Sequence, residues 1–138
     1  MSLPSALESR VFYQAAQQRL QDARLLMGGN RTTAAVYMAG YSVECILKAL
    51  ILELCPARQR AGVAASFRGS KAHDFTWLRA EYARRGGPQL PRRIAKQFIL
   101  VHAWSTNLRY NPRMLGERDA LEFMDAAVEI LKWADRRL

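Results

Sequence analysis

The pattern of hydrophobic residues is most continuous between Thr32 and Cys55, where apolar side chains occupy almost the whole circumference of a predicted helix. A helix with so little polar surface is expected at the centre of the domain. Its polar positions fall in one narrow stripe, the central seam, which consists of Tyr37, Tyr41, Glu44 and Lys48. Because buried charges must be paired or hydrogen-bonded, the seam is interpreted as either an internal network or the wall of a binding site.

The segment before the central helix also has a helical pattern. Ser5 and Glu8 have the spacing of a capping box, which predicts that a helix begins there. Gly28, Gly29 and Asn30 can adopt the positive φ angles that end a helix, and the short turn predicts an antiparallel return into the central helix. The predicted core face of this first helix consists of Phe12, Ala16, Leu20, Ala23 and Met27.

Two short helices and one long helix are predicted after residue 73. Asp74 is placed to cap the first, and Pro91 can occupy the first turn of the second. The last begins near Glu117 and ends near Arg137, with acidic residues at its start and basic residues at its end, as the helix macrodipole favours. The residues expected to face the core are Phe75, Leu78 and Tyr82, then Ile94, Phe98 and Val101, and finally Ala120, Phe123, Ala127, Ile130, Leu131 and Ala134.

Residues 57–72 show no sustained period and are rich in Ala, Arg, Gly and Ser, which predicts a mobile basic loop. No segment alternates convincingly with period two, and the Asn-Gly and Asp-Gly turns of tight hairpins are missing from the sequence. The sequence therefore predicts an all-α fold. We expect a single domain over residues 1–138, arranged as an up-and-down bundle of about five helices.

The net charge of +9 is concentrated in the middle of the chain. Between Ala57 and Lys96 there are ten basic residues but only two acidic ones. Such a basic section favours a phosphate-rich partner, and Arg92, Arg93 and Lys96 are free to face solvent at the start of a predicted helix. The alternative is an arginine-rich solvated surface that binds no partner.

The cysteine positions and the N-terminus predict a cytoplasmic protein. Cys45 and Cys55 lie ten residues apart on one predicted helix, about 15 Å along its axis, which is too far for a disulfide. The first ten residues lack the sections of a signal peptide. Glu44, Lys48 and Glu53 interrupt the most apolar stretch, so a buried core helix is favoured over a membrane span.

Neither a metal nor a cofactor is expected. The two cysteines and the two histidines, His73 and His102, do not have the spacing of metal ligands. The sequence carries neither a Walker-type phosphate loop nor a Rossmann fingerprint.

A second candidate site lies in the segment from Trp104 to Pro112. Arg109 offers a planar guanidinium for phosphate, and Tyr110 or Trp104 offers a ring for base stacking. Alternatively, Trp104 and Tyr110 are packing anchors and Arg109 pairs with an acid such as Glu44. The corresponding alternative for the central seam is a buried Glu44–Lys48 pair that fixes helix register, with the tyrosines donating hydrogen bonds.

The segment AGYSVECILKAL, residues 39–50, resembles the second helix of the HEPN family (higher eukaryote and prokaryote nucleotide-binding), whose members often show a Glu-Cys-x-Leu-Lys core. Further pieces fit in order: YQAAQQRLQDARLL, then His73-Asp74-Phe75, then Trp104 followed by Arg109-Tyr110. The resemblance covers essentially the whole chain. It implies a homodimer that pairs through helices and a separately encoded minimal nucleotidyltransferase as partner, in a toxin–antitoxin or defence-type module.

Catalytic members of the resembled family are mostly ribonucleases with an Arg-x(4-6)-His motif near the start of the last helix. Here Met114, Leu115 and Gly116 occupy the positions where that histidine would follow Arg109. The resemblance therefore implies a non-catalytic or weakly catalytic domain that binds RNA or nucleotides, or that docks to a partner. One Arg-x4-His does occur, from Arg68 to His73, but it lies in the basic section and is interpreted as coincidence.

Two other functions stay open. One is a metal-independent ribonuclease that uses His73 or His102 with Arg109, and the other is a pure scaffold protein. His102 is expected to be half-buried, since a continued helix would direct it near Phe98. A homodimer is also predicted because the central helix has more apolar circumference than its neighbours can readily cover.

Overall fold

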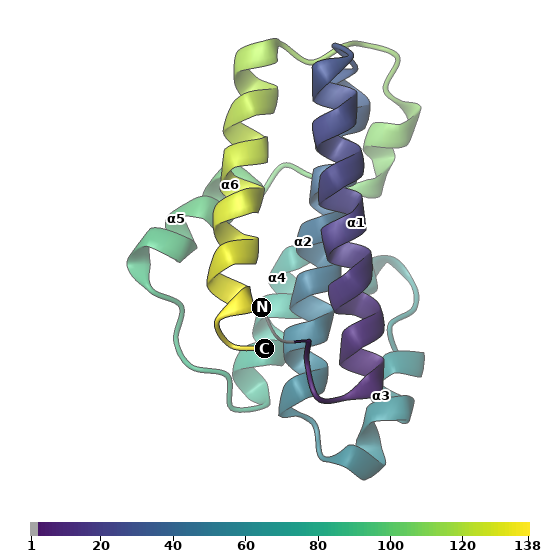
Figure 1. Ribbon diagram of the computed structural model, residues 1–138, viewed down its shortest axis with the longest axis vertical. Helices are drawn as coiled ribbons and strands as arrows, with labels where there is room; N and C mark the ends of the chain where they lie inside the picture. The colour runs from purple at the N-terminus through teal and green to yellow at the C-terminus, as the bar shows by residue number, and fades with distance from the viewer. Residues whose placement is uncertain (1–2) are drawn as a thin grey trace.

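A computed structural model describes residues 3–138 of the protein (Figure 1). Three long helices run along its long axis: α1 (Leu7–Gly28), α2 (Thr32–Leu54) and α6 (Glu117–Asp135). α2 packs against both of the others, and it returns antiparallel to α1 after a short turn at residues 29–31. The described residues contain no strand, so the prediction of an all-α fold is confirmed.

Shorter helices cover the remaining sides of α2. α3 (Arg60–Ala65) and α4 (Phe75–Arg84) contact α2 directly, whereas α5 (Arg92–Leu100) packs against α6. Three short 3-10 helices complete the described chain: η1 (Ala57–Gln59), η2 (Ser70–His73) and η3 (Thr106–Tyr110). The bundle therefore has one α-helix more than the five expected from the sequence, within residues 3–138.

The apolar circumference of α2 is covered within one chain. Ile46, Ile51 and Leu52 are 0 % exposed, although they point in different directions around the helix. α2 is long and apolar enough to cross a bilayer by length and composition, but 78 % of its most apolar window is buried in the bundle. Because α2 is covered within one chain, its apolar surface does not require a dimer. The homodimer stays a prediction from the family resemblance alone.

The helical faces predicted from periodicity are confirmed for the last three helices, whereas Phe12 and Met27 of the predicted α1 face are only partly buried. Phe75, Leu78 and Tyr82 of α4 are buried, as are Ile94 and Phe98 of α5. The same holds for Val101 and for the six α6 residues Ala120, Phe123, Ala127, Ile130, Leu131 and Ala134. Asp74 caps α4, as predicted, by accepting hydrogen bonds from the backbone N–H groups of Thr76 (2.8 Å) and Trp77 (3.3 Å).

The capping box predicted at the N-terminus of α1 is wrong. The helix begins at Leu7, and no side chain of its own N-cap residue accepts a hydrogen bond there. Instead, Glu53 of α2 reaches the same place: its carboxylate accepts from the Ala6 N–H (3.1 Å) and from the Ser5 hydroxyl (3.5 Å). An acid from a neighbouring helix thus supplies the negative charge that the N-terminus of α1 favours.

The segment predicted as a mobile basic loop is helical in three places, η1, α3 and η2, so the prediction of a loop is wrong. Two contacts attach it to the bundle. Phe67 packs edge-on against Phe12, with ring centroids 5.8 Å apart, and Arg60 Nε donates to the carbonyls of Leu52 (3.2 Å) and Cys55 (3.1 Å). The second contact satisfies carbonyl groups that the end of α2 would otherwise leave free.

Candidate functional site

The central seam is a buried ion pair with a third member. Lys48 Nζ donates to Glu44 Oε2 at 2.7 Å, and the two residues are only 5 % and 3 % exposed, which confirms the predicted internal pair. The other carboxylate oxygen, Oε1, lies 2.8 Å from Nδ1 of His73. A carboxylate accepts only, so His73 Nδ1–H donates and the ring is held in a fixed orientation. The sequence did not connect His73 with the seam.

The two ends of this network differ in environment. Lys48 Nζ lies 5.7 Å and 5.4 Å from the ring centroids of Phe12 and Phe67, so aromatic faces surround the ammonium group where water would otherwise lie. The His73 side chain is 39 % exposed. A buried carboxylate thus links a shielded ammonium group to an imidazole that reaches solvent.

The seam tyrosines form the next layer. Tyr37 donates to the Tyr41 hydroxyl at 3.2 Å, and the Tyr41 ring lies edge-on to His73 with centroids 6.2 Å apart. Burial raises the pKa of Tyr41 well above its usual range. The Tyr41 phenol therefore stays neutral at physiological pH.

Trp104 is a packing anchor. Its ring stacks on Phe75 with centroids 5.1 Å apart and an interplanar angle of 9°, and it is 6 % exposed. Its Nε1–H donates to the Tyr37 carbonyl at 3.2 Å. The indole crosses α2 at Gly40, where a Cβ atom would lie 1.9 Å from Nε1. In this arrangement the ring offers no free face for the base stacking that the sequence suggested.

Both histidines line one cavity of about 410 Å³, the histidine cavity. His73 enters it from η2 and His102 from the turn after α5, and Ser105, Thr106 and Asn107 supply further polar groups. His102 is exposed, so the prediction that it is half-buried is wrong. The reason is that α5 ends at Leu100, so the helical direction extrapolated from Phe98 does not apply at His102.

A second cavity, of about 400 Å³, lies at the N-terminus of α2 and is called here the arginine cavity. Arg31, Arg109 and Arg113 line it together with Tyr37 and Asn111. The first turn of α2 contains no acidic residue, and no side chain caps it. Three arginine residues and the positive end of a helix dipole therefore line the same small volume.

Side-chain hydrogen bonds to the backbone hold the third arginine in place. The Thr33 hydroxyl donates to the Arg113 carbonyl (2.6 Å) and accepts from the Leu115 N–H (2.9 Å), while Thr32 donates to the Leu115 carbonyl (2.6 Å). Asn111 Oδ1 accepts from the Arg113 N–H at 3.0 Å. The start of α2 thus fastens the segment between η3 and α6.

Arg109 and Tyr110 lie at the surface. The Arg109 guanidinium carbon is 4.8 Å from the centroid of the Tyr110 ring, and Tyr110 is 72 % exposed. Contact with the side chains of Tyr110 and then Tyr37 raises the pKa of Arg109 further. The alternative pairing of Arg109 with Glu44 does not form, because Lys48 and His73 occupy the two carboxylate oxygens.

The structure divides the predicted phosphate-binding residues into two sets. In Figure 1, α5, which carries the exposed residues Arg92, Arg93 and Lys96, lies on one side of the long helices, and the η3 segment lies on the other. Arg31 and Arg113 were missed as site residues. A basic residue directly before a helix without an acidic first turn is the signal that could have identified Arg31.

The profile of the HEPN domain family matches residues 9–137 of the chain. The chain belongs to the HEPN family. The HEPN domain therefore spans nearly the whole chain, and its family is generally associated with nucleotides and RNA. No match was found among curated proteins or among solved structures.

The part of this HEPN domain that the structure describes contains no cluster of metal-binding side chains. Within residues 3–138 no group of three or more His, Cys, Asp or Glu side chains is placed to hold a metal ion. Asp74, the acid beside the histidine cavity, is already occupied as the cap of α4.

Proposed function

We propose that this HEPN domain binds single-stranded RNA or a nucleotide, with a phosphate group in the arginine cavity. The observation that carries the proposal is the convergence of Arg31, Arg109 and Arg113 on the uncapped N-terminus of α2. Guanidinium groups form paired hydrogen bonds with phosphate oxygens, and a helix N-terminus adds oriented backbone N–H groups. Each of these features favours an anion.

The aromatic residues at the same place favour a nucleotide over inorganic phosphate. Tyr110 is largely exposed beside Arg109, and the Tyr37 ring lines the cavity. A base can stack on an exposed ring while its phosphate is held by a neighbouring guanidinium group, an arrangement that tolerates different base sequences. We therefore expect little discrimination among bases.

The test is equilibrium binding of a fluorescein-labelled single-stranded RNA, followed by anisotropy. The double variant Arg109→Ala/Arg113→Ala keeps the backbone hydrogen bonds that hold the segment and should weaken binding about tenfold or more. The matched control is Arg118→Ala on α6, whose side chain is 93 % exposed and outside the cavity. Equal affinities for the double variant and the control would refute the proposal, and no binding at low salt would favour a scaffold.

A ribonuclease is the second candidate, favoured by the two histidines in one cavity. Cleavage of RNA by its 2′-OH forms a 2′-O–P bond and breaks the P–O5′ bond, which requires one group to take the hydroxyl proton and another to give a proton to the leaving 5′-oxygen. Two imidazoles can divide these roles. His73, oriented by Glu44, suits the base. η3 contributes Thr106 and Asn107 to the histidine cavity and Arg109 to the arginine cavity, so a phosphate near η3 could meet both.

We rank binding above catalysis because Arg109 lacks the histidine that follows it in catalytic relatives of the family. The decisive assay is cleavage of a mixed-sequence RNA in EDTA by the wild type and by His73→Ala, His102→Ala and Arg109→Ala. Robust cleavage that is lost in one histidine variant and in Arg109→Ala would establish the ribonuclease. Cleavage that is unchanged in all three variants would come from a contaminant.

The family also supports a partner. We propose that the domain acts as a homodimer and docks to a minimal nucleotidyltransferase in a toxin–antitoxin or defence-type module. Light scattering that shows a monomer at micromolar concentration would remove the homodimer. Co-expression with any nucleotidyltransferase encoded beside this chain, followed by purification of a stable complex, tests the docking.

A further inference from the structure

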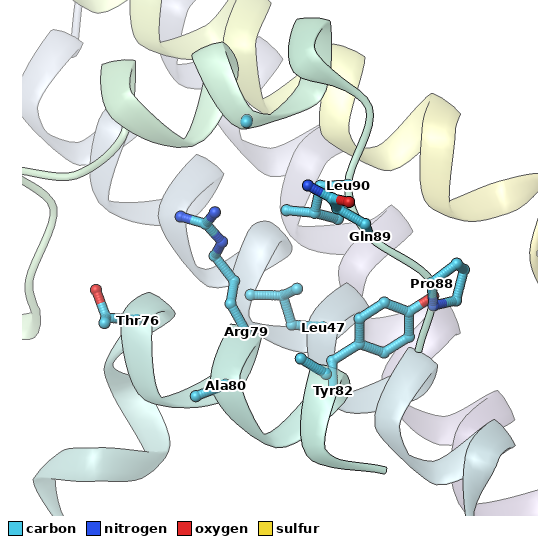
Figure 2. A pocket seen from close by; sticks show the side chains of 10 residues that line it. Leu47, Thr76, Arg79, Ala80, Tyr82, Pro88, Gln89 and Leu90 are labelled. Carbon is cyan, nitrogen blue, oxygen red and sulfur yellow. The ribbon is translucent and has the colours of Figure 1, made fainter. Parts of the chain in front are cut away.

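A third cavity is separate from the arginine cavity but adjoins the histidine cavity, since Thr76 lines both. It has a volume of about 470 Å³ and is bounded by α4, the connection at residues 86–91 and the start of α5, with Leu47 of α2 among its walls (Figure 2). The walls are largely apolar, and Leu90, Ala95 and Tyr82 contribute to them. A volume of this size falls in the range of small-molecule sites. It shares no lining residue with the arginine cavity.

Arg79 is the one charged residue among those that line this α4–α5 cavity in the described chain. Its side chain reaches from α4 toward α5 (Figure 2). The guanidinium carbon lies 4.7 Å from the centroid of the Phe98 ring. Within residues 3–138 no acidic side chain forms an ion pair with Arg79, and its Nε atom is buried without a hydrogen-bond acceptor.

An unpaired and partly buried guanidinium group is unfavourable. Burial lowers the pKa of Arg79, because removing the charged guanidinium group from water is unfavourable. Arg84, on the same helix, shows the usual solution, because it pairs with Glu81. Because Nε is closed off from solvent, a ligand in the cavity would bring its acceptor to the terminal Nη groups of the same guanidinium.

The charge of the cavity selects the anion. One guanidinium group matches a single carboxylate, which can accept two parallel N–H bonds from it. A dianionic phosphate would leave one negative charge against apolar walls, where it would be strongly disfavoured. Among the described residues, the other polar side chains of the lining are Thr76, Tyr82 and Gln89, which are uncharged in their ordinary states, and burial raises the pKa of Tyr82.

We propose that the α4–α5 cavity binds a small hydrophobic carboxylic acid, with its carboxylate on the Arg79 guanidinium group and its apolar body against Leu47 and Leu90. This site goes beyond the proposed RNA-binding function and is independent of it. The carboxylate accepts hydrogen bonds from the terminal N–H groups of Arg79, and the apolar body displaces water from walls that cannot hydrogen-bond it.

The experiment uses octanoate as the probe and the full chain labelled with ¹⁵N. Titration should give saturable amide shifts for a single site, largest at residues 79–83 and 90–95. 1-Octanol has a similar apolar body without the charge and should bind about tenfold more weakly or worse, because it cannot form the charge-assisted hydrogen bonds. Octyl phosphate should also bind more weakly than octanoate.

Variants separate the charge from the apolar walls. Arg79→Met removes the guanidinium group but keeps an unbranched apolar side chain, and it should weaken octanoate about tenfold or more while leaving 1-octanol unchanged. Arg84→Met, on the same helix but outside the cavity, should leave octanoate affinity unchanged. The comparison of octanoate with 1-octanol needs only the wild type. It therefore tests the contribution of the carboxylate even if Arg79→Met does not fold.

Three results would overturn the proposal: equal affinities for octanoate and 1-octanol, shifts that do not saturate or that lie outside the cavity, and tighter binding of octyl phosphate than of octanoate. RNA binding is measured separately on the same sample. If the protein binds RNA but not octanoate, or octanoate but not RNA, the result shows which of the two proposals has failed.

Discussion

Glu44 and His73 lie 29 residues apart in the sequence, yet Oε1 of the carboxylate is 2.8 Å from Nδ1 of the imidazole. The second carboxylate oxygen holds Lys48. One buried acid on α2 therefore fixes both a neighbouring turn of its own helix and the position of η2. Because the acid is 3 % exposed, water cannot replace either partner at little cost.

Replacing Lys48 with Met should destabilise the protein by about 3 kcal/mol, because it leaves the buried Glu44 carboxylate with His73 alone. The double variant Glu44→Leu/Lys48→Met removes both buried charges and should cost much less. His73 can then bond to water, since its side chain is partly exposed. Urea denaturation of both single variants and the double variant measures the coupling. Strictly additive losses would show that Glu44 and Lys48 do not interact.

Gly40→Ala should be strongly destabilising, by on the order of 3 kcal/mol, since the new Cβ would overlap the Trp104 indole. Displacement of Trp104 would also break its hydrogen bond to the Tyr37 carbonyl. The control is Gly28→Ala at the end of α1, where a Cβ meets no atom within 4 Å and should stabilise the helix by about 0.5 kcal/mol. Similar thermal unfolding of the two variants would contradict this account of Trp104.

The Cys45 thiol should react slowly near neutral pH. Burial, and then the negative charge of Glu44, raise its pKa to about 11 from the ordinary 9.0. Only the thiolate reacts, so alkylation of the folded protein by iodoacetamide at pH 8 should be about 100-fold slower than in urea and should rise toward pH 11. The measurement is made in the Cys55→Ala variant, in which Cys45 is the one remaining cysteine of the sequence. A rate that levels off near pH 9 in the folded protein would contradict the raised pKa.

RNA binding should weaken with salt in a way that depends on RNA length. If about five basic residues contact phosphates of a long single strand, log K should fall with log salt at a slope of roughly −3.5, and replacing Arg92, Arg93 and Lys96 with Ala should flatten it by about 2. Because α5 and η3 lie on opposite sides of the long helices (Figure 1), we expect a trinucleotide in the arginine cavity not to contact α5, so its slope should not change in the triple variant. An unchanged slope for the long RNA would show that α5 does not contact it.

The parts of the fold that depend on local periodicity could be predicted from the sequence. The limits of α2, the buried faces of α4, α5 and α6, and the Glu44–Lys48 pair at i and i+4 all follow from the geometry of a single helix. The cap supplied by Glu53 could not be predicted, because its partner at Ala6 is distant in the sequence. The helices within residues 57–72 also depend on contacts, such as that between Phe67 and Phe12, that no local pattern encodes.

The candidate site shows the same division. Arg109 and Tyr110 were recognisable by residue type, and the structure leaves both exposed. Arg31 and Arg113 join Arg109 only because Thr33 binds the backbone of the η3–α6 connection, a relationship between residues 80 positions apart. The link between Glu44 and His73 likewise depends on how η2 returns to α2. Tertiary contacts of this kind carry no periodic signal in a single sequence.

The central claim is that phosphate binds among Arg31, Arg109 and Arg113, and the most direct measurement is a ¹H–¹⁵N titration of the protein with a uridine trinucleotide. The account predicts saturable shifts of the backbone amides of residues 31–34 and 109–113, and their loss in Arg109→Ala/Arg113→Ala but not in Arg118→Ala. Shifts confined to α5, or a double variant that retains the wild-type response, would contradict it.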